Sequence, residues 1–196
     1  MTFSKIIPFF ILPLFVITGC TDSNISSNPL VAPDNWRKET IEFPLSFAPT
    51  LTYKGTEYVR FAPGWGKKDA EDYFTYAFLW YLDEVPTLSS KILESELETY
   101  FNGLMTVVSG SEDTTTSSIP TTKAFFEKLD ETSYVGKVIT YDAFTTKKEV
   151  TLNVIAKYSA CPELEKHLVL FKFSPKKVDH PVWSKLENIQ IDLDCK

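Results

Sequence analysis

Histidine is scarce in this chain, and the common catalytic motifs are absent. Only two histidines, His167 and His180, occur among the 196 residues, and neither stands in a His-Glu-x-x-His or His-x-His spacing. Those spacings are typical of metal centres. The chain also has no Gly-x-Ser-x-Gly motif, which would present a nucleophilic serine on a sharp turn. No pattern therefore identifies an enzyme, and we expect neither a catalytic site nor a resident cofactor or metal.

One weaker metal pattern is present. Cys161, Glu163, Glu165 and His167 alternate along the chain, and in an extended segment their side chains could converge on one ion. A disulfide at Cys161 would remove the strongest ligand from this set. We therefore interpret the segment as a structural loop.

Basic residues are outnumbered by acidic ones. The chain has 20 Lys and Arg against 26 Asp and Glu, a formal net charge of −6. Binding to a phosphate backbone requires clustered basic side chains that release counterions. The composition therefore argues against nucleic acid as a partner.

The longest uncharged apolar run of the chain lies at the N-terminus. After Lys5 no charged residue appears over residues 6–17. This run is shorter than the roughly 20 residues that cross a bilayer, and Pro8 and Pro13 would each interrupt a helix. The segment is typical of a secretory leader that is removed from the mature protein.

The leader ends in Ile17-Thr18-Gly19-Cys20, which resembles the lipobox of bacterial lipoproteins. The resemblance implies cleavage between Gly19 and Cys20 and attachment of fatty acyl chains, such as palmitate, at the Cys20 sulfur. Because Thr21 and not Asp follows Cys20, it also implies the outer membrane, with the protein facing the periplasm. A plain cleaved leader with an unrelated cysteine is the alternative.

Three segments follow from this interpretation. Residues 1–19 form the signal peptide, and residues 20–35 form the lipidated cysteine with a tether rich in Ser, Asn, Asp and Pro, a composition typical of flexible linkers. Residues 36–196 are long enough for one domain with a well-buried core. We expect a single domain there.

The remaining cysteines suggest a disulfide. Acylation of Cys20 would leave Cys161 and Cys195 as the only two thiols. In an oxidising compartment such a pair is expected to be bridged. Two reduced, buried cysteines are the alternative.

Hydrophobic periodicity predicts strands before helices. Segments 39–47 and 56–61 alternate like strands, and residues 73–82 are apolar on both faces, which is typical of a central strand covered by a helix. Residues 88–108 carry apolar side chains at helical spacing, and Ser89 or the next serine can cap that helix.

The second half alternates with period two. It predicts strands at residues 122–129, 134–144, 149–159, 167–173 and 189–195, with a short helix before the last of them. Short connections favour antiparallel pairing. We expect an α+β fold, an antiparallel meander of about seven to eight strands with one long helix packed on a face and a short C-terminal helix. This layout is loosely similar to PsbP/Mog1-type sandwiches.

Three aromatic residues are candidates for binding. Trp65 lies between two glycines, which allow tight turns that could present its indole outward. A Trp packed over the edge of the core is the alternative. Tyr76 and Trp80 belong to the aromatic face of residues 73–82. They could line a cavity for an apolar ligand between sheet and helix.

The sequence favours a lipid-anchored cell-envelope protein that binds another envelope protein or polymer without catalysis. The phrases "FAPGWG" and "LESELETYFNGL" are similar to uncharacterised bacterial secreted proteins, a likeness that implies no activity. Two alternatives stay open. One is an envelope hydrolase whose site forms only in the fold, and the other is a carrier of an apolar ligand.

Overall fold

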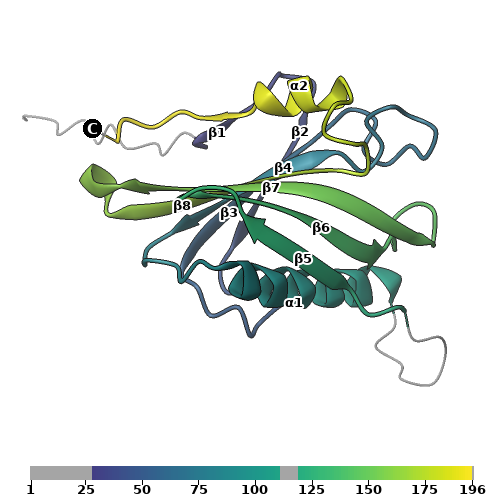
Figure 1. Ribbon diagram of the computed structural model, residues 1–196, viewed down its shortest axis with the longest axis horizontal. Coiled ribbons are helices and arrows are strands. Elements are labelled where there is room, and N and C mark those ends of the chain that lie inside the picture. Colours follow the sequence, from purple (N-terminus) through teal and green to yellow (C-terminus); the bar gives the residue numbers. More distant parts are fainter. Residues whose placement is uncertain (1–27, 111–118, 196) are drawn as a thin grey trace, which may run out of the picture.

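A seven-stranded antiparallel sheet forms the centre of the molecule, with helix α1 on one face and helix α2 beside a two-stranded ribbon on the other (Figure 1). The computed structural model describes residues 28–110 and 119–195. The elements are β1 (Leu30–Val31), β2 (Arg37–Glu42), β3 (Gly55–Phe61), β4 (Tyr76–Leu82), α1 (Ser90–Ser109), β5 (Lys123–Lys128), β6 (Ser133–Tyr141), β7 (Glu149–Cys161), a 3-10 turn (Pro162–Leu164), β8 (Lys166–Ser174), α2 (Val182–Glu187) and β9 (Gln190–Ile191). The expected α+β class is confirmed.

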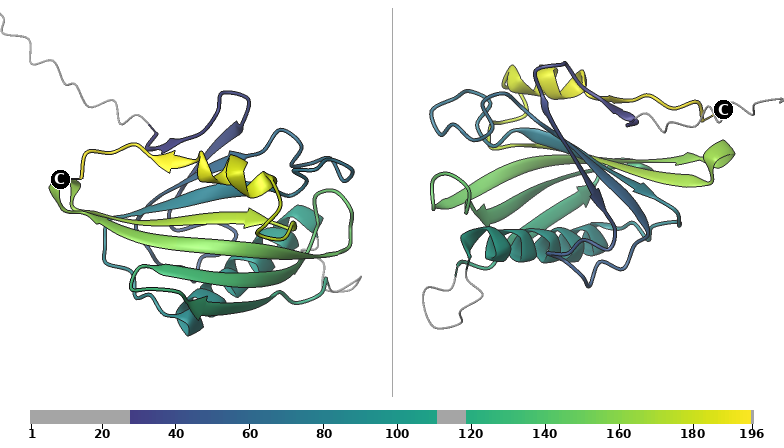
Figure 2. Two further views of the ribbon diagram at one scale, coloured as in Figure 1. Left: turned by 45° about the horizontal axis from the view of Figure 1, so that its top comes forward. Right: turned by 180° about the vertical axis from the view of Figure 1, so that it is seen from behind.

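The sheet is not one continuous meander. Its strand order is β2-β3-β4-β8-β7-β6-β5, so two meanders, β2 to β4 and β5 to β8, meet where β4 pairs with β8. Helix α1 carries the chain from the middle of the sheet to its edge. The strand expected at residues 189–195 is reduced to β9, which pairs with β1 outside the main sheet. The reason is α2, which takes the chain out of the sheet layer before β9 begins (Figure 2).

Strand β4 is the buried centre of the sheet, as its apolar sequence predicts. It starts at Tyr76 and not at residue 73, because Phe74 has a left-handed backbone with φ of 50°. Its alternate residues enter two hydrophobic clusters, one on each face of the sheet. Phe78 faces α1, and Leu79 faces α2.

Helix α1 begins at the expected serine cap and ends at a glycine. The Ser89 side chain accepts a hydrogen bond from the Ile92 N–H, and the helix stops at Gly110, which has φ of 69°. Met105 is fully buried, whereas the neighbouring Leu104 is half-buried. Residues 109–122 after the helix are polar and turn-rich, a composition that predicts a loop, and most of them lie outside the described residues.

Side chains of α1 take the place of a neighbouring strand at the edge of the sheet. The Ala124 and Phe126 N–H groups, which point away from β6, donate to Glu98 Oε1 at 3.1 Å and Glu94 Oε1 at 2.9 Å. The Thr122 N–H donates to Asn102 Oδ1 at 2.8 Å. These acceptors bind backbone N–H groups of the edge strand that would otherwise be free to pair with another chain. The same hydrogen bonds hold α1 over the β5 side of the sheet.

A second layer covers the other face of β3, β4 and β8. Arg60 reaches into it from β3 and donates to the Leu30 carbonyl of β1.

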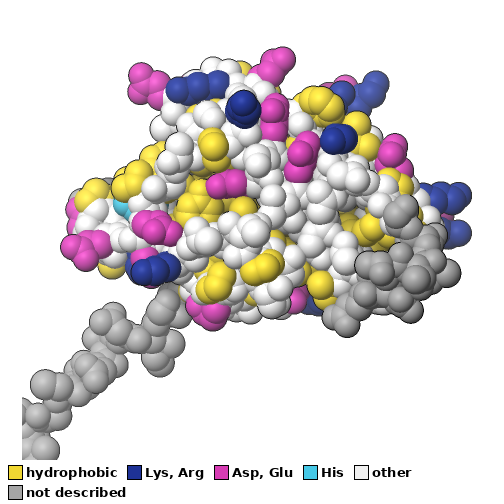
Figure 3. Space-filling view, turned by 90° about the horizontal axis from the view of Figure 1, so that it is seen from below, with side chains coloured by type: hydrophobic (Ala, Val, Ile, Leu, Met, Phe, Trp, Pro, Cys, Tyr) yellow, Lys and Arg dark blue, Asp and Glu magenta, His cyan; other side chains and the backbone are white. Residues whose placement is uncertain are grey.

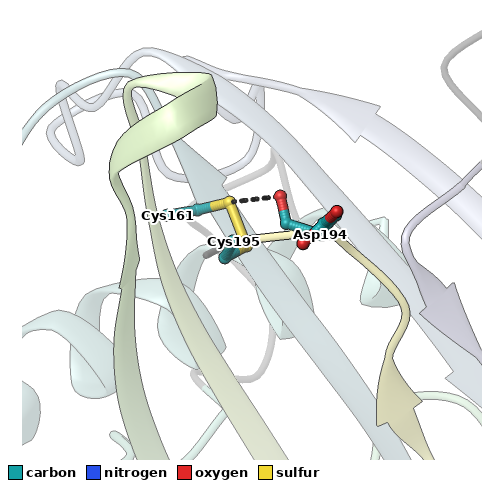
Figure 4. Close-up of a disulfide and its surroundings, with 3 residues drawn as sticks. All are labelled: Cys161, Asp194 and Cys195. Atoms are coloured by element: carbon teal, nitrogen blue, oxygen red, sulfur yellow. Dashed lines mark hydrogen bonds between the residues drawn. A yellow bond between two sulfur atoms is a disulfide. The ribbon is translucent and has the colours of Figure 1, made fainter.

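The predicted disulfide between Cys161 and Cys195 is present and joins the end of β7 to the C-terminal segment (Figure 4). The carbonyl oxygen of Asp194 lies 3.8 Å from the Cys161 sulfur. Both hydrophobic clusters consist of residues between 30 and 195, so a chain that starts at residue 28 retains every described core contact.

Candidate functional site

The position of α1 leaves part of the sheet beside it uncovered. The helix packs closest to β5 and β6, so the β2 and β3 end of the same face is open to a groove of about 500 Å³. Figure 3 shows this side of the molecule, where hydrophobic side chains are exposed between acidic ones. We call the cavity the groove. Its lining residues are Arg37, Glu39, Ile41, Ser46, Phe47, Val59, Phe61, Trp65, Phe74, Tyr76, Tyr100, Leu104, Met105, Val108 and Phe144.

The groove is lined mainly by apolar side chains. Val59 and Phe61 come from β3, and Leu104 and Val108 come from the last two turns of α1. The helix can approach the loop after β2 closely because residue 103 is glycine: a Cβ there would lie 1.8 Å from a backbone oxygen of that loop. Sheet, helix and loop therefore form three walls of one cavity.

Trp65 closes one end of the groove. It is half-buried and packs edge-on against Phe61 and Phe144, with ring centroids 4.9 Å away in each case. Gly64 allows this turn, because a Cβ there would lie 1.9 Å from Asp72 Oδ1. The buried Trp65 Nε1 has no hydrogen-bond partner in the described part of the chain. A buried indole N–H without a partner costs roughly 1–3 kcal/mol.

Arg37 supplies a positive charge at the mouth of the groove. Its guanidinium carbon lies 4.1 Å from the centroid of the Phe61 ring and 5.5 Å from that of Trp65, a cation–π arrangement. Within residues 28–110 and 119–195, no carboxylate oxygen lies within 4.0 Å of it. Glu39, two residues along the same face of β2, also lines the groove. The mouth therefore carries a stacked cation that is free to meet an anion.

A buried carboxyl group lies beneath the groove. Glu57 is fully buried and receives hydrogen bonds from Trp80 Nε1 at 2.7 Å and from the Tyr100 hydroxyl at 2.9 Å. Burial raises the pKa of Glu57 to about 7, and the two hydrogen bonds oppose that rise. Since Tyr100 also lines the groove, this network joins the groove wall to the core.

The three aromatic candidates take different places. Trp65 and Tyr76 both line the groove, although Tyr76 is buried. Trp80 does not line it: the side chain is fully buried and its indole N–H is bound to Glu57. Gly19 and Cys20 lie outside the described residues.

Both histidines have structural hydrogen bonds. His167 Nδ1 lies 2.9 Å from the Tyr158 hydroxyl, and His180 Nδ1 accepts from the Val182 N–H at 3.1 Å. Cys161 is in the disulfide, so its sulfur is not a metal ligand. Among the residues that the structure describes, no three His, Cys, Asp or Glu side chains gather as metal ligands would.

Sequence reasoning missed Arg37 and Glu57. A signal for Glu57 was present, because it alternates in phase with Val59 and Phe61 and so occupies an inward position of its strand. A charged residue at an inward position is unusual enough to mark a special role. Arg37 gave no comparable signal, because its partners Phe61 and Trp65 are distant in sequence.

Comparison with known proteins assigns no family. No protein-family model, curated protein or solved structure matches the chain. Within the described ranges, neither helix is long and apolar enough to cross a membrane. The interpretation of the groove therefore depends on its own geometry.

Proposed function

We propose that this chain is a lipid-anchored protein of the bacterial cell envelope that binds a small organic acid with an apolar body. The anchor is Cys20, on the strength of its lipobox-like surroundings, and the protein faces the periplasm from the outer membrane. The groove is the binding site. The sequence favours a non-catalytic binding role, and this proposal adds the chemistry of the ligand.

The groove is the observation that carries the proposal. Its volume of about 500 Å³ lies within the roughly 300–1,000 Å³ of typical small-molecule sites, which are mostly apolar with a few polar groups. Aromatic side chains such as Phe61 and Trp65 offer a large, rigid apolar surface to a ligand.

The polar groups indicate the charge of the ligand. Arg37 at the mouth matches a carboxylate, to which a guanidinium can donate two hydrogen bonds. An acid with an apolar tail or ring can place its carboxylate at Arg37 while its body fills the cavity.

The test compares decanoate with the neutral 1-decanol on a protein of residues 28–196, by titration calorimetry. Arg37→Gln should weaken decanoate binding about tenfold, or about 1.4 kcal/mol, and leave decanol binding unchanged. Lys38→Gln is the matched control, because it removes the same charge from the adjacent position of β2, which faces away from the groove. Val108→Trp should fill the groove and abolish binding of both molecules.

Two results would refute the proposal. One is an absence of binding for both decanoate and decanol. The other is binding that survives Val108→Trp, which would place the ligand elsewhere on the protein.

A further inference from the structure

The sheet has a second uncovered surface, on the face opposite α1. Phe126 and Val138 pack under α1, so the alternate residues of β5, β6 and β7 point to the other side. The layer of α2 and β9 covers β3, β4 and β8 and contacts Ile155 and Cys161 of β7, but it leaves β5, β6 and the rest of β7 open (Figure 2). We call this surface of β5, β6 and β7 the open face.

The open face is basic, although the chain as a whole is acidic. Four lysines point to the open face or border it. Two glutamates also point to it, and both stand near the end of their strand. The lysines are Lys123, Lys137, Lys157 and Lys172, and the glutamates are Glu127 and Glu149. Within the described ranges, none of these four lysines has a carboxylate oxygen within 4.0 Å. Lys123, Lys137 and Lys157 therefore form a concentration of exposed positive charge, whereas Lys172 is half-buried beside α2, where it interacts with the carboxyl group of Glu187.

Apolar side chains lie exposed among these lysines. Phe125, at the edge strand, is 57% exposed, and Val178, in the loop before α2, is 58% exposed. Both border a depression whose floor includes Val135 and Ile155. A surface that combines lysines with exposed apolar side chains is suited to the interface of a bilayer, where apolar groups enter and lysines meet anionic headgroups.

The reach of the tether limits how far the start of β1 can lie from a membrane. The first described residue, Asn28, leads into β1, which lies on the α2 side of the sheet (Figure 1). Eight residue steps separate Asn28 from Cys20, and at full extension they span at most about 29 Å. A lipid at Cys20 therefore keeps Asn28 within that distance of the bilayer, and the open face lies on the same side of the sheet as β1.

We propose that the open face docks on the anionic headgroups of the lipid bilayer to which the chain is anchored. This orientation rests on the lipid anchor proposed above, whereas the affinity of the open face for anionic lipid does not. Docking holds the domain with α1 and its groove directed away from the bilayer. The groove then stays accessible to ligands in the surrounding solution.

The experiment uses residues 28–196, which lack the anchor and retain the described core. The protein is sedimented with vesicles of phosphatidylcholine alone or with about 30% phosphatidylglycerol, at low salt and at about 0.5 M NaCl. We expect binding only to the anionic vesicles, weakened by salt. Lys137→Glu with Lys157→Glu should reduce the partition coefficient at least about tenfold, and Phe125→Ser should reduce it severalfold without a change of charge.

The matched control is Lys67→Glu with Lys68→Glu. It makes the same change of net charge at exposed lysines of the loop after β3 and should leave vesicle binding unchanged. Equal thermal unfolding midpoints of the variants exclude a loss of fold. Because the groove is left intact, decanoate binding should persist in the open-face variants.

Three outcomes would overturn the proposal. Equal binding to neutral and anionic vesicles, or binding to neither, would show that anionic headgroups do not attract the open face. An equal loss with the control variant would mean that net charge alone governs binding. Binding to soluble dextran sulfate that is insensitive to Phe125→Ser, without binding to vesicles, would identify a polyanion as the partner.

Discussion

The buried carboxyl group of Glu57 should make the stability of the protein fall as the pH rises toward neutrality. Burial raises its pKa from 4.5 to about 7 in the folded protein, so the carboxyl keeps its proton there after the unfolded chain has lost it. Between these pH values the folded state binds one more proton, and the free energy of unfolding decreases with pH. A shift of this size corresponds to about 3 kcal/mol, lost between about pH 4.5 and pH 7.

Glu57→Gln isolates this contribution. The glutamine has nearly the same shape as the protonated acid, can still bond to Trp80 and Tyr100, and does not ionise. Urea unfolding followed by tryptophan fluorescence gives the free energy of unfolding at about pH 5 and about pH 8. Relative to the wild type, we expect the variant to gain about 3 kcal/mol between these two pH values.

The Glu96→Gln variant should be measured alongside Glu57→Gln, because a second buried carboxyl group contributes to the pH dependence. Burial also raises the pKa of Glu96 to about 7, opposed by a hydrogen bond from the Tyr53 hydroxyl, so part of the wild-type pH dependence belongs to this group. If Glu57→Gln leaves the pH dependence unchanged, Glu57 is ionised in the folded protein at neutral pH. Its two hydrogen bonds would then outweigh the cost of burial, contrary to the reasoning above.

Two further predictions concern stability. Replacing both Cys161 and Cys195 by alanine should lower the free energy of unfolding by roughly 3.5–4 kcal/mol in the chain-entropy account of a bridge over 34 residues. Urea unfolding measures this, and an unchanged midpoint would contradict it. Glu98→Ala should cost about 1–2 kcal/mol and promote self-association, because it leaves the Ala124 N–H at the sheet edge without its acceptor. Glu98→Gln keeps an acceptor and should behave like the wild type in sedimentation velocity and unfolding.

The fold could be predicted where the pattern is local. Alternation in residues 73–82 and helical spacing in residues 88–108 are visible in any short window of the sequence, and both elements form there. The disulfide could be inferred from the number of cysteines and the expected compartment. Strand order could not, because the pairing of β4 with β8 joins segments about 90 residues apart and depends on where α1 carries the chain.

By itself, the sequence determined the α+β class, the main strands and helix, and which of their faces are buried. These properties follow from side-chain periodicity, which acts over a few residues. Tertiary structure alone decided the site. Hydrogen bonds such as that between Glu94 and Phe126 hold α1 to one side of the sheet, and the groove is the surface that α1 leaves uncovered. Arg37 and Trp65 come together there because tertiary packing brings distant segments of the chain into contact. No local sequence pattern shows that these two residues are neighbours.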